Sequence, residues 1–206
     1  MGWNVHLDAA IPRCRGPHSA PGLDENDVAV FFVMMRFVIA GLLLLIFVPK
    51  TWRGLKDREV WKGGLILGVI VWGGFILQML GLTDVTPAVS AFLTSLYVVF
   101  TALIGVALGM QKMTRFAILG VLLATFGAGW ISGPPQLNFG LGEWLTVGCA
   151  FLFGAHIIAT DRVTKVVDPI QVTATMLITV ATLSGFRYIW RSQESSLVNL
   201  LLAERV

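Results

Sequence analysis

The sequence has 206 residues, of which 56% are hydrophobic and only 13% are charged, and its mean hydropathy is +0.79. A soluble domain carries about 25% charged residues, so this composition excludes an ordinary soluble domain and indicates that lipid is the main solvent. The formal net charge of +3 does not point to nucleic acid, because in such a chain lysine and arginine report where loops lie relative to the membrane.

The first 27 residues form a polar segment that contains three prolines and scattered charges. The segment has no apolar run long enough for a signal peptide or a membrane span, and we interpret residues 1–27 as a disordered tail. Its Cys14 and the later Cys149 lie in unlike surroundings, one polar and one apolar. The two cysteines therefore predict neither a disulfide framework nor a metal site.

Six apolar stretches follow the tail. They run over approximately 28–48, 63–82, 88–108, 115–133, 143–160 and 171–190. A helix needs roughly 20 apolar residues to cross the hydrocarbon core of a bilayer, and each stretch is close to that length. Because the runs are continuously apolar and do not alternate with polar residues, they predict helices and not barrel strands. The predicted fold class is an all-α membrane protein with six transmembrane helices.

Local signals mark the start of two of these helices. Thr86 followed by Pro87 is typical of an N-cap with proline in the first turn. Asp168 followed by Pro169 repeats the pattern, and Gln171 stands where its side chain could reach back to the cap. The third and sixth spans are therefore expected to begin at these positions.

Basic residues occur on alternate connections between the spans. The nine are Lys50, Arg53, Lys56, Arg58, Lys62, Lys112, Arg115, Arg162 and Lys165, and the two other connections contain none. Loops rich in lysine and arginine stay on the cytoplasmic side, so we predict a multi-pass protein of the cell membrane with these three loops in the cytoplasm. Both termini would then lie outside, which Arg187, Arg191 and Arg205 fit less well.

Glycines recur at a spacing of four in two of the spans, as Gly64 and Gly68 and as Gly105 and Gly109. In lipid, helices associate through close backbone approach at small residues, so these positions predict helix packing. The alternative is that they form sliding surfaces of a moving transporter.

Two polar residues interrupt the apolar runs, Arg36 in the first span and Gln78 in the second. An arginine at the centre of a span costs about 2.5–3.5 kcal/mol on insertion scales, and a buried amide loses its hydration. Arg36 either pairs with carbonyls and snorkels toward the outer face, or binds an anionic group of a substrate in a cavity. Gln78 either joins helices or contacts a substrate.

Further candidates for the wall of a substrate cavity lie on the neighbouring spans. Thr94, Tyr97 and Thr101 follow a spacing of three to four and would share one helical face, which lines a path or simply packs. Trp72 lies on the preceding span. His156 is the histidine that lies within a predicted span. Its role is either structural, through a hydrogen bond, or part of substrate binding.

Signatures of catalysis and metal binding are absent from the sequence. It has no nucleophile paired with a base, no phosphate-binding glycine loop and no second His or Cys at ligand spacing from His156. Asp84 and Glu143 are placed in outer loops, so no carboxylate is expected at membrane depth to relay protons. We expect no enzyme activity, no metal and no cofactor.

Three segments resemble an EamA-type member of the drug/metabolite transporter superfamily. They are FILQMLGLTDVTPAVSAFLTSLYVVFTALIGVALG from residue 75, RFAILGVLLATFGAGWIS from residue 115, and GEWLTVGCAFLFGAHIIATDRVTKVVDPIQV from residue 142. The stretch from Arg36 to Ala40 resembles the second span of that family. The resemblance covers roughly residues 27–184.

The resemblance implies a ten-helix transporter built from two inverted five-helix repeats, with a substrate cavity between them. On this basis we divide the chain into the tail 1–27, a first repeat without its first span 28–133, an outer loop 134–142, the start of a second repeat 143–190 and an atypical tail 191–206. The acidic residue that often follows the fourth span of the family is absent, since Gly109-Met110-Gln111-Lys112 stand there. We expect a chain truncated at both ends relative to the family.

The sequence thus predicts an alternating-access transporter of small metabolites that works in membrane lipid without nucleic acid. The alternative is a non-transporting remnant or helper subunit that pairs with another membrane half-protein or with a second copy of itself. A channel is a third reading. The substrate, the coupling ion and the direction of transport do not follow from the sequence.

Overall fold

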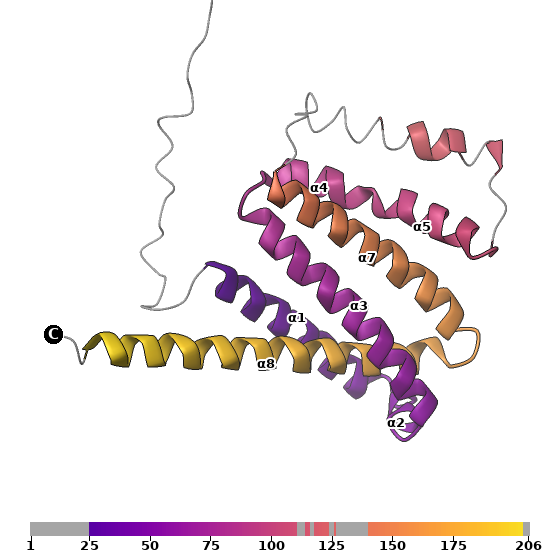
Figure 1. Cartoon of the computed structure of the whole chain (residues 1–206). Helices are drawn as coiled ribbons and strands as arrows, with labels where there is room; N and C mark the ends of the chain where they lie inside the picture. The colour runs from indigo at the N-terminus through magenta and orange to yellow at the C-terminus, as the bar shows by residue number, and fades with distance from the viewer. Residues whose placement is uncertain (1–24, 111–113, 116–117, 124–125, 127–139, 204–206) are drawn as a thin grey trace, which may run out of the picture.

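The computed structural model describes residues 25–110, 114–115, 118–123, 126 and 140–203, and the regular elements in that part of the chain are helices (Figure 1). Their bounds are α1 Glu25–Phe47, α2 Thr51–Gly54, α3 Arg58–Leu82, α4 Pro87–Ser95, α5 Tyr97–Ala107, α7 Leu141–Val163 and α8 Pro169–Ala203. The predicted all-α class is confirmed.

Five segments of the described part are long and apolar enough to cross a membrane. They are Val30–Phe47, Arg58–Leu82, Pro87–Ala107, Leu141–Val163 and Pro169–Arg191. These segments correspond to five of the six predicted spans. The remaining prediction, 115–133, falls largely outside the described residues.

The α3 helix begins five residues before the predicted apolar run, because its first turn is polar. The Asp57 carboxylate accepts a hydrogen bond from the Glu59 N–H at 2.9 Å and so caps the helix. Lys62 then pairs with Glu59 at 2.5 Å, one turn along the same helix. At the start of α7, the predicted loop residue Glu143 lies instead in the first turn, where it accepts a hydrogen bond from the Gly140 N–H at 2.8 Å.

The predicted third span is divided into α4 and α5 at Leu96. The Leu96 N–H donates to the Leu93 carbonyl at 3.2 Å, a bond one residue shorter than in an α-helix. The neighbouring Ser95 hydroxyl donates to the Phe92 carbonyl at 2.6 Å and competes for the same turn. Leu96 thus separates two helices within this predicted span, with Thr94 on α4 and with Tyr97 and Thr101 on α5, and the expectation that the three share one face stays a prediction.

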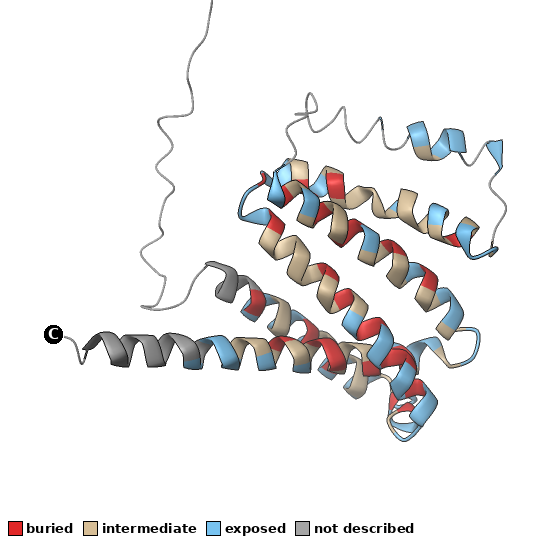
Figure 2. Cartoon of the chain, in the orientation of Figure 1, coloured by how far each residue is buried: buried red, intermediate tan, exposed pale blue. Residues whose placement is uncertain are grey.

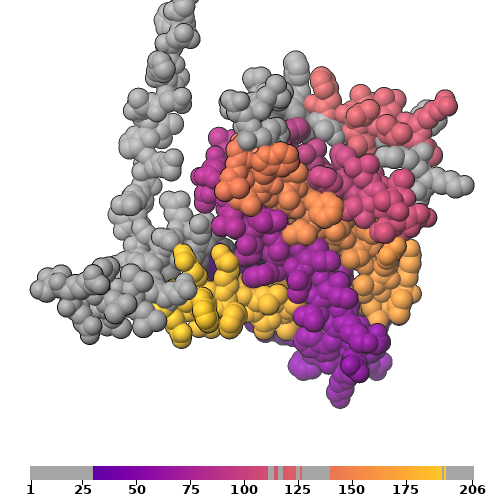
Figure 3. All heavy atoms as spheres, viewed as in Figure 1, coloured from indigo at the N-terminus to yellow at the C-terminus, as the bar shows by residue number. Residues whose placement is uncertain are grey.

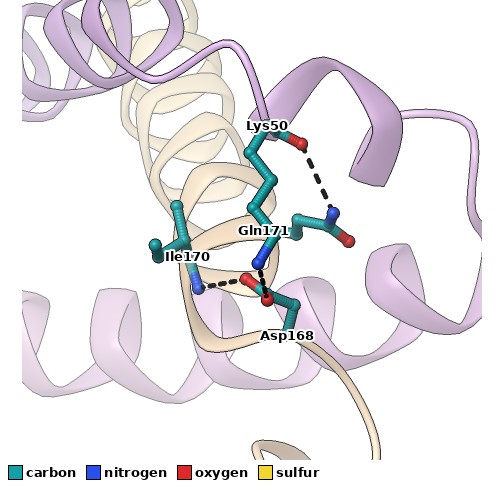
Figure 4. Close-up of polar contacts among 4 residues, drawn as sticks. All are labelled: Lys50, Asp168, Ile170 and Gln171. Carbon is teal, nitrogen blue, oxygen red and sulfur yellow. Dashed lines mark hydrogen bonds and ion pairs between the residues drawn. The ribbon is translucent and has the colours of Figure 1, made fainter.

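Two helix starts show the predicted caps. Thr86 Oγ1 accepts a bond from the Val89 N–H at 3.4 Å, with Pro87 in the first turn of α4. Asp168 Oδ1 accepts from the Ile170 N–H at 3.1 Å at the start of α8. The expectation for Gln171 is wrong, because its amide donates to the Lys50 carbonyl at 3.3 Å instead of reaching back to the cap (Figure 4).

The long helices pack side by side in the order α1, α8, α3, α7 and α4–α5, so α3 lies between α7 and α8 (Figure 1). Helices from the two predicted repeats therefore alternate in space. A Cβ placed on Gly41 would lie 3.7 Å from the Leu177 Cβ, and one on Gly185 would lie 3.4 Å from the Met34 sulfur, so α1 and α8 are antiparallel. The same reasoning makes α3 and α7 antiparallel, since Gly63 meets Val163 and Gly81 meets Gly142.

The buried residues concentrate where α3 meets its neighbours (Figure 2). Large apolar side chains are exposed on the outside of the helix row. One core cluster joins Val60, Leu67 and Val172, and a second joins Phe37, Val71 and Val180. Outward-facing side chains such as those of Phe32 and Ile46 are more than two thirds exposed, at 67% and 68%. An apolar exterior of this kind is expected for helices that face the hydrocarbon core of a bilayer.

The α3–α8 contact is a close crossing of glycines against threonines. A Cβ placed on Gly64 would lie 2.0 Å from the Thr175 Oγ1, and one on Gly68 would lie 2.7 Å from the Thr179 Cβ. The buried Thr175 hydroxyl shares its one proton between the Val60 carbonyl of α3 at 3.2 Å and the Val172 carbonyl of its own helix at 3.0 Å. The backbones of α3 and α8 thus approach closely at this crossing, and the Thr175 hydroxyl between them is hydrogen-bonded.

The other predicted glycine pair lies on α5 and just beyond it. Gly105 is buried. Gly109 has a φ of 68°, and no described atom lies within 4 Å of a Cβ placed on it. Gly109 therefore supplies the left-handed residue that ends α5, a position where glycine is favoured.

A cluster of polar contacts ties the α1–α2 connection to the first turn of α8. The Lys50 ammonium pairs with the Asp168 carboxylate at 2.6 Å, beside the bond from Gln171 to the Lys50 carbonyl (Figure 4). The hydrogen bond from Lys50 lowers the pKa of Asp168 below its ordinary value. The connections that hold Lys50 and Asp168 thus lie at the same end of the helix row.

Candidate functional site

Arg36 lies within the membrane-spanning part of α1 and packs against aromatic rings. Its guanidinium carbon is 5.5 Å from the centroid of the Phe37 ring and 5.3 Å from that of the Phe75 ring on α3. The ion pairs of the described residues join other groups, and none includes Arg36. The charge is thus held by cation–π contacts and is not neutralised by a carboxylate of the described chain.

Two further predicted residues lie next to this pair of rings. Trp72 and Phe75 both pack against the core cluster that contains Phe37. The Trp72 Nε1–H is buried and has no hydrogen-bond partner in the described part of the chain. Gln78 is partly buried and follows Phe75 by three residues, so the two share a face of α3. Arg36 thus lies over the Phe75 ring, and Trp72 and Gln78 lie on the same helix as Phe75.

Aromatic contacts continue from α3 to α7. The Phe75 and Phe153 rings meet edge to face, with centroids 5.5 Å apart, and Phe153 also covers Gly74. His156 follows Phe153 by three residues on α7. Its Nδ1 is buried and has no hydrogen bond of standard geometry within the described part of the chain, while its Nε2 is 3.5 Å from the Thr160 hydroxyl and the imidazole interacts with the Leu67 backbone of α3. Atoms of α3 and α7 lie next to each other on the face that Figure 3 shows.

The predicted threonine–tyrosine stripe meets the opposite side of α7. A Cβ placed on Gly154 would lie 3.0 Å from the Thr101 nitrogen and 3.1 Å from the Tyr97 carbonyl oxygen. The Thr101 hydroxyl donates to that same Tyr97 carbonyl at 2.7 Å. The Thr94 hydroxyl, on α4, is buried and has no partner among the described residues.

In the described part of the chain, the seven predicted cavity residues fall into separate groups. Arg36 lies over the Phe75 ring, and Trp72 and Gln78 lie on the same helix as Phe75. His156 lies on α7 one turn from Phe153, and Thr94, Tyr97 and Thr101 lie along α4 and α5. Three of the seven supply the buried side-chain nitrogen and oxygen atoms that lack a partner in the described part of the chain. The sequence did not single out Phe75, Phe153 or Gly154, although the glycine within the apolar run FLFGAHI was a visible signal.

A groove of the described surface lies elsewhere, between α1 and α8. It has a volume of about 260 Å³ and is lined by Phe37, Val38, Gly41, Leu42, Leu45, Leu177, Ile178, Ala181 and Thr182. Its walls are almost entirely apolar, so it suits hydrocarbon and not a polar solute. No group of three potential metal ligands occurs among the described residues.

The comparisons with known proteins give a consistent result. The model of the EamA-like transporter family matches residues 25–133. A protein of Archaeoglobus fulgidus named "Uncharacterized transporter" is 31% identical over 138 residues, which is 67% of this chain and 42% of that relative. The chain thus spans less than half the length of the curated relative it matches. No solved structure matches it.

Proposed function

The chain belongs to the EamA-like transporter family, and on that premise we propose that it forms part of a carrier that moves small metabolites across the cell membrane by alternating access. It is a multi-pass membrane protein by family and by the apolar helices described above. The proposal concerns what these helices do within the membrane.

The observation that supports it is the set of buried polar atoms without hydrogen-bond partners in the described part of the chain, Trp72 Nε1, Thr94 Oγ1 and His156 Nδ1. Leaving one buried hydrogen-bonding atom unsatisfied costs about 1–3 kcal/mol, and hydrocarbon offers no substitute partner. Three such atoms on α3, α4 and α7 are explained if water or a polar solute enters the bundle. A protein whose helices only packed together would have no need of them.

Cysteine accessibility tests whether the interior is wet. In a chain with Cys14→Ser and Cys149→Ala, we expect Thr94→Cys to react with a small charged methanethiosulfonate, because a polar path brings the reagent to that position. Ala174→Cys is the matched control, since Ala174 is fully buried on α8 and should stay unlabelled. Equal protection of both positions would contradict a water-filled path.

Flux through proteoliposomes tests transport itself. We expect efflux of at least one member of a panel of radiolabelled amino acids, nucleosides and organic amines above that from protein-free liposomes. Thr94→Val should reduce this flux while the protein stays folded, because only the hydroxyl is removed. If the folded chain moves none of the panel, the alternative of a non-transporting subunit that pairs with another membrane protein is favoured.

We further propose that the basic connections face the cytoplasm, because lysine and arginine collect on that side of a membrane. Lys56→Cys, in the connection between α2 and α3, should react with an impermeant maleimide only after cells are permeabilised. Asp84→Cys, in the turn between α3 and α4, should react in intact cells. The reverse pattern would invert the proposed topology.

A further inference from the structure

We propose that the groove between α1 and α8 binds an acyl chain of an anionic phospholipid, and that the basic turn at the end of this groove binds the phosphate of the same lipid. The basic turn is residues 50–58, which lead from the end of α1 through α2 to the start of α3. This inference goes beyond the proposed function, because it names a lipid partner whose binding does not depend on transport.

The first support is the chemistry of the groove walls. The lining side chains are apolar except for that of Thr182, whose hydroxyl donates to the Ile178 carbonyl of its own helix at 2.7 Å. Leu42, in the opposite wall, is 53% exposed and lies within a segment that is long and apolar enough to cross the membrane. The groove is therefore open to the hydrocarbon of a bilayer and offers a polar solute no free side-chain donor, whereas an acyl chain would contact apolar side chains on both walls.

The second support is that the groove leads to the basic turn. Leu45 lines the groove, and its carbonyl accepts a hydrogen bond from the Trp52 Nε1–H at 3.0 Å. Beyond Leu45, the ion pair of Lys50 with Asp168 joins the end of α1 to the start of α8, the same two helices that form the groove (Figure 4). A lipid whose chain lay in the groove would therefore have its headgroup next to this turn.

The third support is the way in which α2 is fixed. Thr51 and Gly54 are buried, and a Cβ placed on Gly54 would lie 2.5 Å from the Gln171 Cβ, so this side of α2 packs against α8. Trp52 and Arg53 lie between these two positions and are exposed. The fold thus holds one side of the turn in place and leaves the other side available to a headgroup.

The fourth support is the positive charge of the turn. The exposed cations that take part in none of the ion pairs of the described residues are Arg53, Lys56 and Arg58. The Lys56 N–H donates to the Arg53 carbonyl at 3.2 Å, so these two residues belong to one tight turn. The Asp57 carboxylate caps α3 through the Glu59 N–H and offsets only part of the charge. Guanidinium and ammonium groups bind phosphate through charge-assisted hydrogen bonds, so an anionic headgroup complements this surface.

Two tryptophans mark the depth of the turn in the membrane. Trp52 and Trp61 are 59% and 37% exposed, and their indole N–H groups donate to the carbonyls of Leu45 and Leu55. Tryptophan is enriched at the boundary between hydrocarbon and headgroups. We therefore place the cations between them at the level of the lipid phosphates, which favours a lipid over a nucleic acid or an acidic protein as the source of the anion.

Native mass spectrometry of the delipidated chain in an uncharged maltoside detergent tests the headgroup. We expect the chain to retain dioleoylphosphatidylglycerol about fivefold or more better than dioleoylphosphatidylcholine, because only the former carries a net negative charge. Equal retention of the two lipids would overturn the proposal. A dimer that binds no lipid would also overturn it, since a second copy of the chain would then be the partner of the groove.

Competition on the wild-type chain tests whether the acyl chain is needed. Glycerol phosphate carries the phosphate charge without acyl chains, so an excess of it should leave phosphatidylglycerol bound. Displacement of the lipid by glycerol phosphate would overturn the assignment of the groove to an acyl chain.

Charge variants locate the headgroup. Arg53→Gln and Lys56→Gln should each weaken retention of phosphatidylglycerol by about fivefold, the effect expected for one basic residue near an anionic surface. Lys165→Gln is the matched control, because it removes the same charge from a residue that is already paired with Asp161. Undiminished retention by both turn variants, or an equal loss in the control, would overturn the proposal.

A groove variant locates the acyl chain. Thr182→Phe places a ring in the open side of the groove and should weaken retention by about tenfold, because contact with roughly two CH₂ groups of the lipid is lost. Thr83→Phe, at an exposed threonine beyond the far end of α3, is the matched control and should bind like the wild type. Full retention by folded Thr182→Phe would overturn the proposal, and if this variant does not fold, the competition with glycerol phosphate decides the same point.

Discussion

Two regions of the molecule use threonine inside the membrane in opposite ways. At the α3–α8 crossing, the Thr175 hydroxyl lies against Gly64 and donates to the Val60 carbonyl at 3.2 Å. On α4, the Thr94 hydroxyl is as well hidden from the outside but has no partner among the described residues. The comparison teaches that a buried hydroxyl marks a binding path only where the protein leaves it unsatisfied. The α3–α8 crossing is therefore a structural contact, and the region around Thr94 is the candidate for function.

The strongest test of this comparison is to add one methyl group at the crossing. Gly64→Ala would place a Cβ 2.0 Å from the Thr175 Oγ1 and 2.9 Å from the Met176 backbone nitrogen, so the helices would have to separate. We expect a loss of about 3 kcal/mol in unfolding free energy, at the upper end of the usual cost of overpacking. Unfolding in mixed detergent micelles measures it.

Gly41→Ala is the matched control for that substitution. The added Cβ on α1 would lie 3.7 Å from the Leu177 Cβ, which is an ordinary van der Waals distance. The contacted helix is again α8, as for Gly64→Ala. We expect a stability close to that of the wild type. A similar loss of unfolding free energy from both substitutions would show that α8 tolerates no added volume along its length. The close approach at Gly64 would then not explain the cost.

A smaller effect should separate the two threonines themselves. Thr175→Val removes the hydroxyl that bonds the Val60 and Val172 carbonyls and should cost about 1 kcal/mol. Thr94→Val should leave the unfolding free energy unchanged or raise it, because no hydrogen bond to a described residue is lost. The same unfolding assay serves both variants. If Thr94→Val proved the more damaging, the hydroxyl would have a structural partner and the functional reading of α4 would fail.

The smallest effect is expected at the exposed contact between Lys50 and Asp168. The hydrogen bond from Lys50 lowers the pKa of Asp168 below its ordinary value of 3.8. The pair therefore stabilises the fold at pH values above the ordinary pKa, and this contribution disappears as the pH falls through the lowered pKa. Exposed ion pairs contribute little, so the shift of the melting midpoint should be small.

Asp168→Asn isolates that charge, because asparagine can still cap α8. We expect the melting midpoints of wild type and variant to differ slightly at pH 7 and to converge below pH 3.8, the ordinary pKa of the group. Asp161→Asn, which breaks the 2.6 Å pair with Lys165 within one stretch of chain, is the control for loss of a local ion pair. A difference that persists unchanged into acid would mean that the carboxylate acts through something other than its charge.

Much of the fold follows from the sequence because hydropathy reports the solvent directly. The predicted run 143–160 lies within α7, and Thr86 and Asp168 cap the helices they were expected to cap. Hydropathy missed the polar first turn of α3, which depends on the Asp57 cap. It also missed the break at Leu96, since no glycine or proline marks it and the competing Ser95 hydroxyl is an ordinary feature of helices.

The sequence predicts individual polar residues of a candidate site but not their arrangement. Trp72, Thr94 and His156 stand in apolar runs, where polar groups are costly, and each has a buried atom that lacks a partner in the described part of the chain. Their grouping depends on which helices are neighbours, and a single sequence contains no signal that α3 lies between α7 and α8. Phe75 was overlooked for the same reason, because a phenylalanine in an apolar run is unremarkable until Arg36 is placed over its ring.

The interleaved order of the helices has a consequence for biosynthesis. The main neighbour of α1 is α8, which the ribosome makes only after every other described helix has been released. At about 5–20 residues per second, α1 waits on the order of ten seconds in the bilayer before that neighbour emerges. During this interval, lipid or an insertion chaperone must contact the face of α1 that later packs against α8. The Arg36 side chain lies in the same environment until then.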